Sequence, residues 1–479
     1  MTVRTRFAPS PTGLLHVGST RTALYAWLYA RQHNGALVLR IEDTDKAREM
    51  EGAIGHIMES LRWLGIDWDE GTDKDGPYGP YIQSARLPIY VRYARQLLQA
   101  GHAYPDLSTE SDREAYRKEA EQAGKPFLMR KYRPERITEW NGRSPLRFKV
   151  PKVKRFAWHD LVLGDLSAGE EALDDFIILK HDGYPTYNFA HVVDDIEMQI
   201  SHVMRGQEFL ASTPKYLSLY EALDQPPPVF VTLPPILGEG GTKKLSKREG
   251  AQDVLDYRTQ GYLPEALFNF LALLGWHPPG NNEILTREEL LRIFDIERVQ
   301  KGGAQFDLEK LNHINREHLK HLTDKDFLKK AELSAPDTAV LTRALPTIRE
   351  RAHTFSEARD LLLDEFSFLF KEPEITLEKL VSKTPGDEPN KASREHLEAI
   401  SGLLEPLHEE AEVEAVKVAV MPYADAIPKE QGGRGAALWP LRYALSGKER
   451  SPDPFILIHA LGKKESLSRI QRAIAILTT

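Results

Sequence analysis

Residues 4–41 read RTRFAPSPTGLLHVGSTRTALYAWLYARQHNGALVLRI. Residues 2–7 predict a short strand, and a turn rich in proline and glycine separates it from residues 18–34, where apolar side chains recur at helical spacing. Gly35 is placed to end this helix, and the apolar run 36–41 predicts the next strand. We therefore expect a strand, a helix and a second strand, with the first turn opening onto the N-terminus of the helix.

Strands and helices continue to alternate beyond this start. Amphipathic patterns predict helices near 54–64 and 89–98, and strand-like runs return near 200–204 and 229–233. This alternation predicts an α/β fold with a doubly wound, Rossmann-like sheet. Between the two halves, residues 104–184 have a looser and more charged pattern, which indicates an inserted α+β domain.

The chain changes character after a loop rich in glycine and lysine at 238–250. Helices are predicted near 263–276 and 287–296, and from 319 to 479 nearly every apolar pattern is helical. This predicts a separate all-helical C-terminal region. Within it, residues 383–392 are polar enough to predict a linker or a loose loop.

Composition restricts the class of protein. With 479 residues, the chain is too long for one hydrophobic core, and no apolar run approaches the length of a membrane span. The first residues lack the features of a secretory signal, so we expect a soluble, cytoplasmic protein. The absence of cysteine excludes disulfides, thiolate nucleophiles and cysteine-bound zinc. The net charge of −8 gives no global sign of nucleic-acid binding, but a whole-chain sum averages over local basic tracks.

Two motifs suggest phosphate chemistry. His16, Gly18 and Ser19 fall at the predicted helix N-terminus, where free N–H groups and the helix dipole favour an anion. The second motif, Lys243 to Arg248, places lysines in a glycine-rich loop that is suited to neutralise a triphosphate. Alone, each motif is more often structural or a solvated surface, but their combination favours nucleotide chemistry.

The sequence resembles the glutamyl-tRNA synthetase family of class I. Residues 16–19 (HVGS) match its HIGH motif and residues 244–248 (KLSKR) its KMSKS motif, in the same order. The resemblance covers essentially the whole chain through further segments, namely 4–13, 40–45, 81–84, 185–188, 261–266 and 441–442.

The resemblance implies a reaction in two steps. Glutamate attacks the α-phosphorus of ATP, and a terminal ribose hydroxyl of tRNA(Glu) then takes the glutamyl group. Mg²⁺ accompanies ATP, no structural zinc is expected, and the protein is expected to be a monomer without membrane contact. Whether tRNA(Gln) is also charged stays open.

The same resemblance assigns residues by position. The catalytic residues are His16, Gly18, Lys244 and Lys247. ATP is bound by His16, Gly18, Ser19, Glu208, Lys244, Ser246 and Lys247. Glutamate is bound by Arg6, Ala8, Ser10, Glu42, Tyr187, His191 and Arg205, with Arg6 and Arg205 facing the side-chain carboxylate and Glu42 the ammonium group. The chain departs from the usual family pattern at His191, Gln207 and Glu208, and their roles stay open.

Domain boundaries also follow from the resemblance. Residues 1–103 and 185–237 are expected to form the two halves of a class I Rossmann-like catalytic domain. Residues 104–184 are expected to bind the tRNA acceptor end. Residues 238–318 carry the KMSKS loop and contact the tRNA stem, and the helical residues 319–479 bind the anticodon.

Three other interpretations fit the sequence less well. A glutamine–tRNA ligase shares the catalytic core but usually ends in β-barrels, which the helical pattern after residue 319 disfavours. A truncated relative that glutamylates a modified tRNA base lacks the anticodon-binding region, so its length does not fit. A catalytically silent RNA-binding paralogue is disfavoured by the presence of His16, Lys247, Arg6, Glu42 and Arg205.

Overall fold

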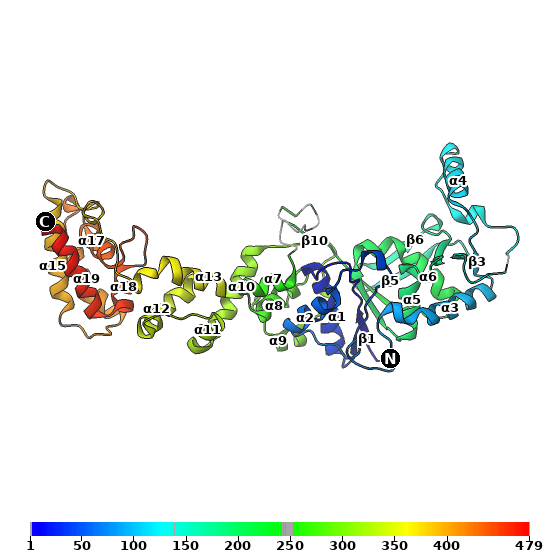
Figure 1. Cartoon of the computed structure of the whole chain (residues 1–479), viewed down its shortest axis with the longest axis horizontal. Coiled ribbons are helices and arrows are strands. Elements are labelled where there is room, and N and C mark those ends of the chain that lie inside the picture. Colours follow the sequence, from blue (N-terminus) through cyan, green and yellow to red (C-terminus); the bar gives the residue numbers. More distant parts are fainter. Residues whose placement is uncertain are drawn as a thin grey trace. The chain divides into compact units, whose positions relative to one another are not determined.

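The computed structural model describes residues 2–137, 139–238, 240–241, 243, 245 and 252–478. The chain divides into two compact units, shown in Figure 1. The first comprises residues Met1–Arg258 and Pro264–Ile314, and the second comprises Thr259–Leu263 and Asn315–Thr479. Each unit is described by itself.

The first unit begins with the predicted strand, helix and strand. These are β1 (Arg4–Phe7), α1 (Val17–Gln32) and β2 (Ala36–Leu39), and β1 pairs with β2 in parallel. A glycine is needed just before β2, because a side chain at Gly35 would collide with the backbone carbonyl of Val3. Two parallel strands must be joined by a crossover connection, and α1 is that connection. Its buried residues pack against the two strands.

Three further strands, β8 (His202–Gly206), β9 (Val229–Leu233) and β5 (Phe156–Asp160), run parallel to one another, and a fourth, β6 (Gly164–Ala168), is antiparallel. Strand β8 pairs with β9, β9 adjoins β5, and β5 pairs with β6. The backbone N–H of Ser201 donates to the carbonyl of Arg4 (2.9 Å), so the chain entering β8 lies beside β1. The carboxyl ends of β1, β2 and β8 therefore meet at one edge of the sheet, where ligands of such folds bind.

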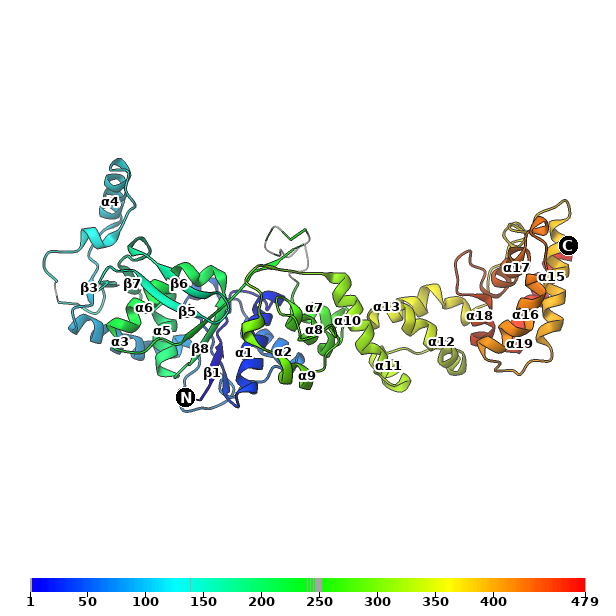
Figure 2. The same ribbon diagram turned by 180° about the vertical axis from the view of Figure 1, so that it is seen from behind.

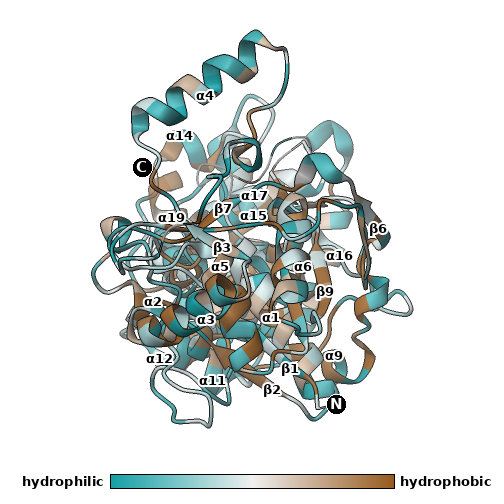
Figure 3. Cartoon of the chain, turned by 90° about the vertical axis from the view of Figure 1, so that its right-hand side faces the viewer, coloured by the Kyte–Doolittle hydropathy of each residue, from teal (hydrophilic) through white to brown (hydrophobic). Residues whose placement is uncertain are grey.

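Residues between the sheet's halves form a smaller antiparallel sheet. Its strands are β3 (Ala103–Pro105), β4 (Leu146–Phe148) and β7 (Phe176–Leu179), in the order β3-β4-β7. Helices α3 (Leu87–Gln99), α5 (Tyr187–Glu197) and α6 (Thr213–Ala222) share one hydrophobic core with these strands. Figure 3 shows that α4 (Glu110–Gln122), by contrast, is mostly hydrophilic, and Ala120 is its one buried residue.

The remaining elements of the first unit are short. Helix α2 (Ala53–Trp63) follows β2, and the later elements are β10 (Ile236–Leu237), α7 (Val254–Thr259), α8 (Pro264–Leu273), α9 (Arg287–Ile293), β11 (Ala304–Gln305) and the start of α10 (Leu308–Lys320). Short 3-10 turns connect several of them.

The second unit is helical throughout its described residues, as predicted. Figure 2 shows its helices from behind. They are α11 (Asp324–Lys330), α12 (Thr338–Arg351), α13 (Phe355–Asp360), α14 (Leu377–Leu380), α15 (Pro389–Leu404), α16 (Val413–Asp425), α17 (Arg434–Ser446), α18 (Pro454–Leu461) and α19 (Lys463–Thr478). The loop predicted over 383–392 is wrong in its second half, because α15 begins at Pro389. Proline fits the first turn of a helix, where its missing N–H has no partner to lose. Among the described residues, no helix is long and apolar enough to cross a membrane.

Candidate active site

The turn after β1 delivers His16 to the N-terminus of α1. His16 has an extended backbone and caps the helix, and its Nδ1 accepts the N–H of Gly18 (3.2 Å). Because Nδ1 accepts, the proton of a neutral ring sits on Nε2, which lies 3.3 Å from Ser19 Oγ. A side chain at Gly18 would place its Cβ 3.1 Å from His16 Cε1. The glycine therefore leaves room for the His16 ring against the helix end.

A cavity of about 1290 Å³ lies over this turn and over the sheet edge. Most of the residues assigned from the sequence line it together: Arg6, Ala8, Ser10, His16, Gly18, Ser19, Glu42, Tyr187, Arg205 and Glu208. His191 is not among the lining residues, because it lies buried behind Arg205. Lys244, Ser246 and Lys247 lie outside the described residues.

Arg205 is a buried cation on the cavity wall. It comes from β8 and is only 7% exposed. Its guanidinium carbon lies 4.5 Å from the centre of the Tyr216 ring, and Nη1 lies 3.3 Å from His191 Nε2. Within the part of the chain that the structure describes, it forms no ion pair with a carboxylate. A buried cation in this state is strongly favoured to bind an anion.

His191 supports Arg205 as a neutral group. Arginine has only donors, so His191 Nε2 accepts from Arg205 and the ring proton sits on Nδ1. Burial lowers the pKa of His191 well below its ordinary value, and the Arg205 charge lowers that pKa further. His191 therefore orients the guanidinium without adding a competing charge.

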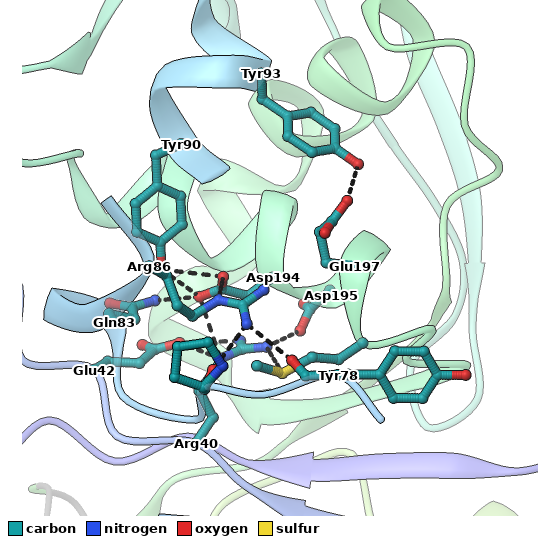
Figure 4. Close-up of polar contacts among 12 residues, drawn as sticks. Arg40, Glu42, Tyr78, Gln83, Arg86, Tyr90, Tyr93, Asp194, Asp195 and Glu197 are labelled. Carbon is teal, nitrogen blue, oxygen red and sulfur yellow. Dashed lines mark hydrogen bonds and ion pairs between the residues drawn. The ribbon is translucent and has the colours of Figure 1, made fainter. Parts of the chain in front are cut away.

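One carboxylate, Asp195 of α5, joins two arginines beneath the cavity. Its Oδ1 accepts from Arg6 Nε (3.2 Å) and from Arg40 Nη1 (2.8 Å). Arg40, fully buried after β2, also donates from Nη2 to Glu42 Oε1 (3.0 Å). Figure 4 shows Arg40 between Glu42 and Asp195. The positions of Arg6 and Glu42, two cavity residues, are thus coupled through Asp195 and Arg40.

The adjacent Asp194 organises a second group farther from the cavity. Its oxygens accept from Arg86 Nε (2.7 Å), Gln83 Nε2 (2.8 Å) and the Tyr90 hydroxyl (2.9 Å), as Figure 4 shows. None of these four residues is among the described residues that line the cavity. The roles of Asp194, Asp195, Arg40 and Arg86 were not predicted, although the segments 40–45 and 81–84 had pointed to two of the sequence regions involved.

Burial and charge shift the pKa values of the two acidic residues in opposite directions. Burial raises the pKa of Glu42 to about 7, and the opposing charges of Arg40 and Arg6 do not fully compensate. Burial also acts to raise the pKa of Asp195, but Arg6 and Arg40 outweigh it and hold that pKa below its ordinary value. Asp195 is therefore a permanent anion, whereas Glu42 titrates near neutrality.

Several basic residues of the helical region that is expected to bind the anticodon have partners within the chain. Arg343 pairs with Glu410, Arg349 with Asp324 and Arg351 with Glu365, while Arg442 and Lys448 donate to backbone carbonyls. These contacts show that each of the five also has a structural role. Among the described residues, no group of three or more His, Cys, Asp or Glu side chains is arranged to hold a metal ion.

Two family models together match nearly the whole chain. The model described as the catalytic domain of class I tRNA synthetases (E and Q) matches residues 2–313, and the anticodon binding domain matches residues 309–474. Glutamate–tRNA ligases of Symbiobacterium thermophilum and Carboxydothermus hydrogenoformans are each 41% identical to this chain, over 98% of it and 99% of the relative.

Solved structures of glutamate–tRNA ligases resemble this chain over essentially its whole length. The crystal structure of a glutamate tRNA ligase from Elizabethkingia meningosepticum, in complex with its amino acid, is 35% identical, with a TM-score of 0.85 over 100% of both chains. The glutamate-tRNA synthetase of Elizabethkingia anophelis is 34% identical, with a TM-score of 0.83 over 99% of this chain and 100% of that one. The predicted fold class is confirmed, and the chain belongs to the glutamate–tRNA ligase family of class I aminoacyl-tRNA synthetases.

Proposed function

We propose that this chain activates glutamate with ATP and transfers the glutamyl group to tRNA(Glu). The observation that carries the proposal is Arg205, a buried guanidinium without a carboxylate partner among the described residues, in the same cavity as the His16 turn. The cavity therefore offers an anion site for an amino-acid side chain and a phosphate site at a helix N-terminus.

The amino-acid end selects for a negative charge. Three buried arginines and two buried carboxylates lie at or beneath the cavity: Arg6, Arg40, Arg205, Glu42 and Asp195. With Glu42 ionised, one positive charge is left over, and the side-chain carboxylate of glutamate neutralises it. The uncharged amide of glutamine leaves that charge buried and unpaired, which is costly.

The family resemblance and the cavity lining support individual roles for these residues. Arg205 and Arg6 bind the side-chain carboxylate, Glu42 holds the ammonium group, and Tyr187 packs along the substrate. Ala8 and Ser10 form the wall of the turn, and His191 acts through Arg205.

The nucleotide end lies at the start of α1. His16 Nε2–H, Ser19 and the backbone N–H groups beside Gly18 face the phosphates, and Glu208 lies on the same cavity wall. Lys244, Ser246 and Lys247 are assigned to the phosphates from the sequence motif. Mg²⁺ carried by ATP would neutralise part of the phosphate charge at this end of the cavity.

The reaction needs no covalent intermediate with the protein. An oxygen of the glutamate α-carboxylate attacks the α-phosphorus, pyrophosphate leaves, and glutamyl-adenylate forms. The terminal ribose hydroxyl of tRNA then attacks the acyl carbon and releases its proton to solvent, and AMP leaves. The protein accelerates both steps by holding the reactants in line and by stabilising charge that develops on the phosphate.

Binding of tRNA spans several regions in this proposal. Residues 104–184 contact the acceptor end, 238–318 carry the KMSKS loop and contact the stem, and 319–479 read the anticodon. The protein works as a monomer in the cytoplasm, where tRNA is charged.

Aminoacylation of purified tRNA(Glu) and tRNA(Gln) with labelled glutamate, ATP and Mg²⁺ tests the proposal. Lys247→Ala and Arg205→Ala are the inactive controls, and labelled glutamine replaces glutamate in a parallel reaction. We expect glutamate but not glutamine on tRNA(Glu). Charging of tRNA(Gln) as well would identify a non-discriminating ligase. A folded wild-type protein that charges neither tRNA would refute the function and favour a silent RNA-binding paralogue.

A further inference from the structure

A side-chain pair away from the amino-acid end joins α2 to the start of α7. His56 Nε2 lies 2.7 Å from Asp253 Oδ2, and the two side chains are only 16% and 13% exposed. Asp253 Oδ1 also accepts the backbone N–H of Leu255 (3.1 Å), so both carboxylate oxygens are bonded. Because an ionised carboxylate only accepts, the proton of the contact belongs to His56 Nε2.

Backbone contacts connect Asp253 with the His16 turn. His16 and Asp253 form an antiparallel bridge, and the N–H of Val254 donates to the carbonyl of Leu15 (3.0 Å). Asp253 and His16 line the same cavity, as does Ile57, the neighbour of His56 in α2. In the sequence, Asp253 comes shortly after the KLSKR motif. His56 is therefore tied, through one carboxylate, to the cavity wall beside His16.

A second ion pair joins the same two helices but does not reach the cavity. Glu59 Oε1 lies 2.9 Å from Arg258 Nη2, with side chains 54% and 44% exposed, and neither residue is among the described residues of the cavity lining. A purely structural role, holding α2 against α7, would be shared by both pairs. Only the His56–Asp253 pair is placed to affect the reacting groups.

We propose that His56 is a positioning residue for glutamate activation: through Asp253 it holds the cavity wall in place beside His16. The inference rests on the proposed function. Without His56, Asp253 keeps its bond to Leu255 but loses its anchor on α2, so the bridge to His16 is free to shift. A shift of this kind disturbs the alignment of the phosphates in the transition state more than it disturbs binding of glutamate at the other end.

The test compares His56→Ala with two matched variants in aminoacylation at saturating tRNA. We expect His56→Ala to lower kcat about tenfold, while KM for glutamate stays within about twofold of the wild type. His56→Gln should recover most of the rate, because the glutamine Nε2 donates from nearly the same place as the histidine Nε2. Glu59→Gln, which breaks the neighbouring pair, should leave kcat unchanged.

Hydrogen exchange gives a readout that does not depend on catalysis. The amides of Val254 and Leu255 should exchange faster in His56→Ala but not in Glu59→Gln. The proposal is overturned if His56→Ala keeps the wild-type kcat, if His56→Gln is as slow as His56→Ala, or if Glu59→Gln slows the reaction equally. A wild-type protein that charges no tRNA refutes the proposed function itself, whereas an active wild type with unaffected variants refutes only the role of His56.

Discussion

Asp195→Asn tests how the glutamate end of the cavity is held. The amide replaces the carboxylate without changing its size, but it removes the charge shared by Arg6 and Arg40. Arg40 keeps Glu42 at 3.0 Å and Asp194 at 3.7 Å, whereas Arg6 loses its one carboxylate partner among the described residues. Removing one partner of a buried ion pair lowers the free energy of unfolding by about 3–5 kcal/mol. Because only one arginine is left unpaired here, we expect a loss of about 3 kcal/mol.

The same substitution should weaken glutamate binding. Without the Asp195 carboxylate, Arg6 loses the partner of its Nε. Its remaining bond, from Nη1 to the carbonyl of Met204 (3.0 Å), does not fix the guanidinium plane alone. We expect KM for glutamate to rise at least about tenfold, which corresponds to a loss of about 1.4 kcal/mol. KM for ATP should stay close to the wild-type value, because Asp195 bonds Arg6 and Arg40 at the amino-acid end of the cavity.

Asp194→Asn is the matched control. Asp194 is also buried and bonds Arg86, and its one contact with the Arg40 network is a long ion pair of 3.7 Å. Urea-dependent hydrogen exchange of amides in α1 and β8 measures the free energy of opening of the catalytic unit. Both variants should lower this free energy of opening by a similar amount. Only Asp195→Asn should raise KM for glutamate. An equal rise of KM in Asp194→Asn would show that any loosening of the core weakens the site, and the positioning argument would be refuted.

Four further predictions follow from the site. Because burial raises the pKa of Glu42 to about 7 and the ionised form binds the ammonium group, KM for glutamate should fall as pH rises from 6 to 8, and Glu42→Gln should remove that dependence. The same raised pKa means that Glu42 contributes stability below its ordinary carboxylate range and loses it as pH rises through 7, which acid-to-neutral unfolding curves can measure. Arg205→Lys keeps the charge but loses the two-nitrogen fork and the stack on Tyr216, so initial-rate kinetics should show KM for glutamate raised roughly tenfold or more. Gly18→Ala should lower kcat roughly tenfold at unchanged KM for glutamate, because its Cβ would meet His16 Cε1 at 3.1 Å and displace the ring.

Local patterns were sufficient to predict most of the elements. The strand, helix and strand of residues 4–39 were found because apolar spacing, Gly35 and the following apolar run all agree. Boundaries were less accurate: the helix expected to reach residue 276 ends at Leu273. In the helical unit, Pro346, Pro422 and Pro440 lie inside α12, α16 and α17. Tertiary packing there outweighs the local cost of proline.

The two ends of the site were not equally predictable. His16, Gly18 and Ser19 are close in sequence, and their roles follow from being at the start of one helix. The amino-acid end depends on Asp195 and its two arginine partners. Asp195 lies 155 positions after Arg40 and 189 positions after Arg6. Ion pairs between residues so far apart produce no periodic pattern in the sequence. The sequence alone therefore does not distinguish Asp195 from any other acidic residue of a helix.

This difference in sequence distance has a mechanistic consequence. At the phosphate end, His16, Gly18 and Ser19 are placed by one turn and one helix, although Asp253 from a distant segment supports the wall beside them. The amino-acid end exists only when β1, the residues after β2, and α5 are packed together, because Asp195 must meet Arg6 and Arg40 at the same oxygen. Perturbations of the parallel sheet should therefore impair glutamate recognition before they impair nucleotide binding. Recognition of glutamate is in this sense a property of the tertiary structure, whereas the His16 turn is formed by one local segment of the chain.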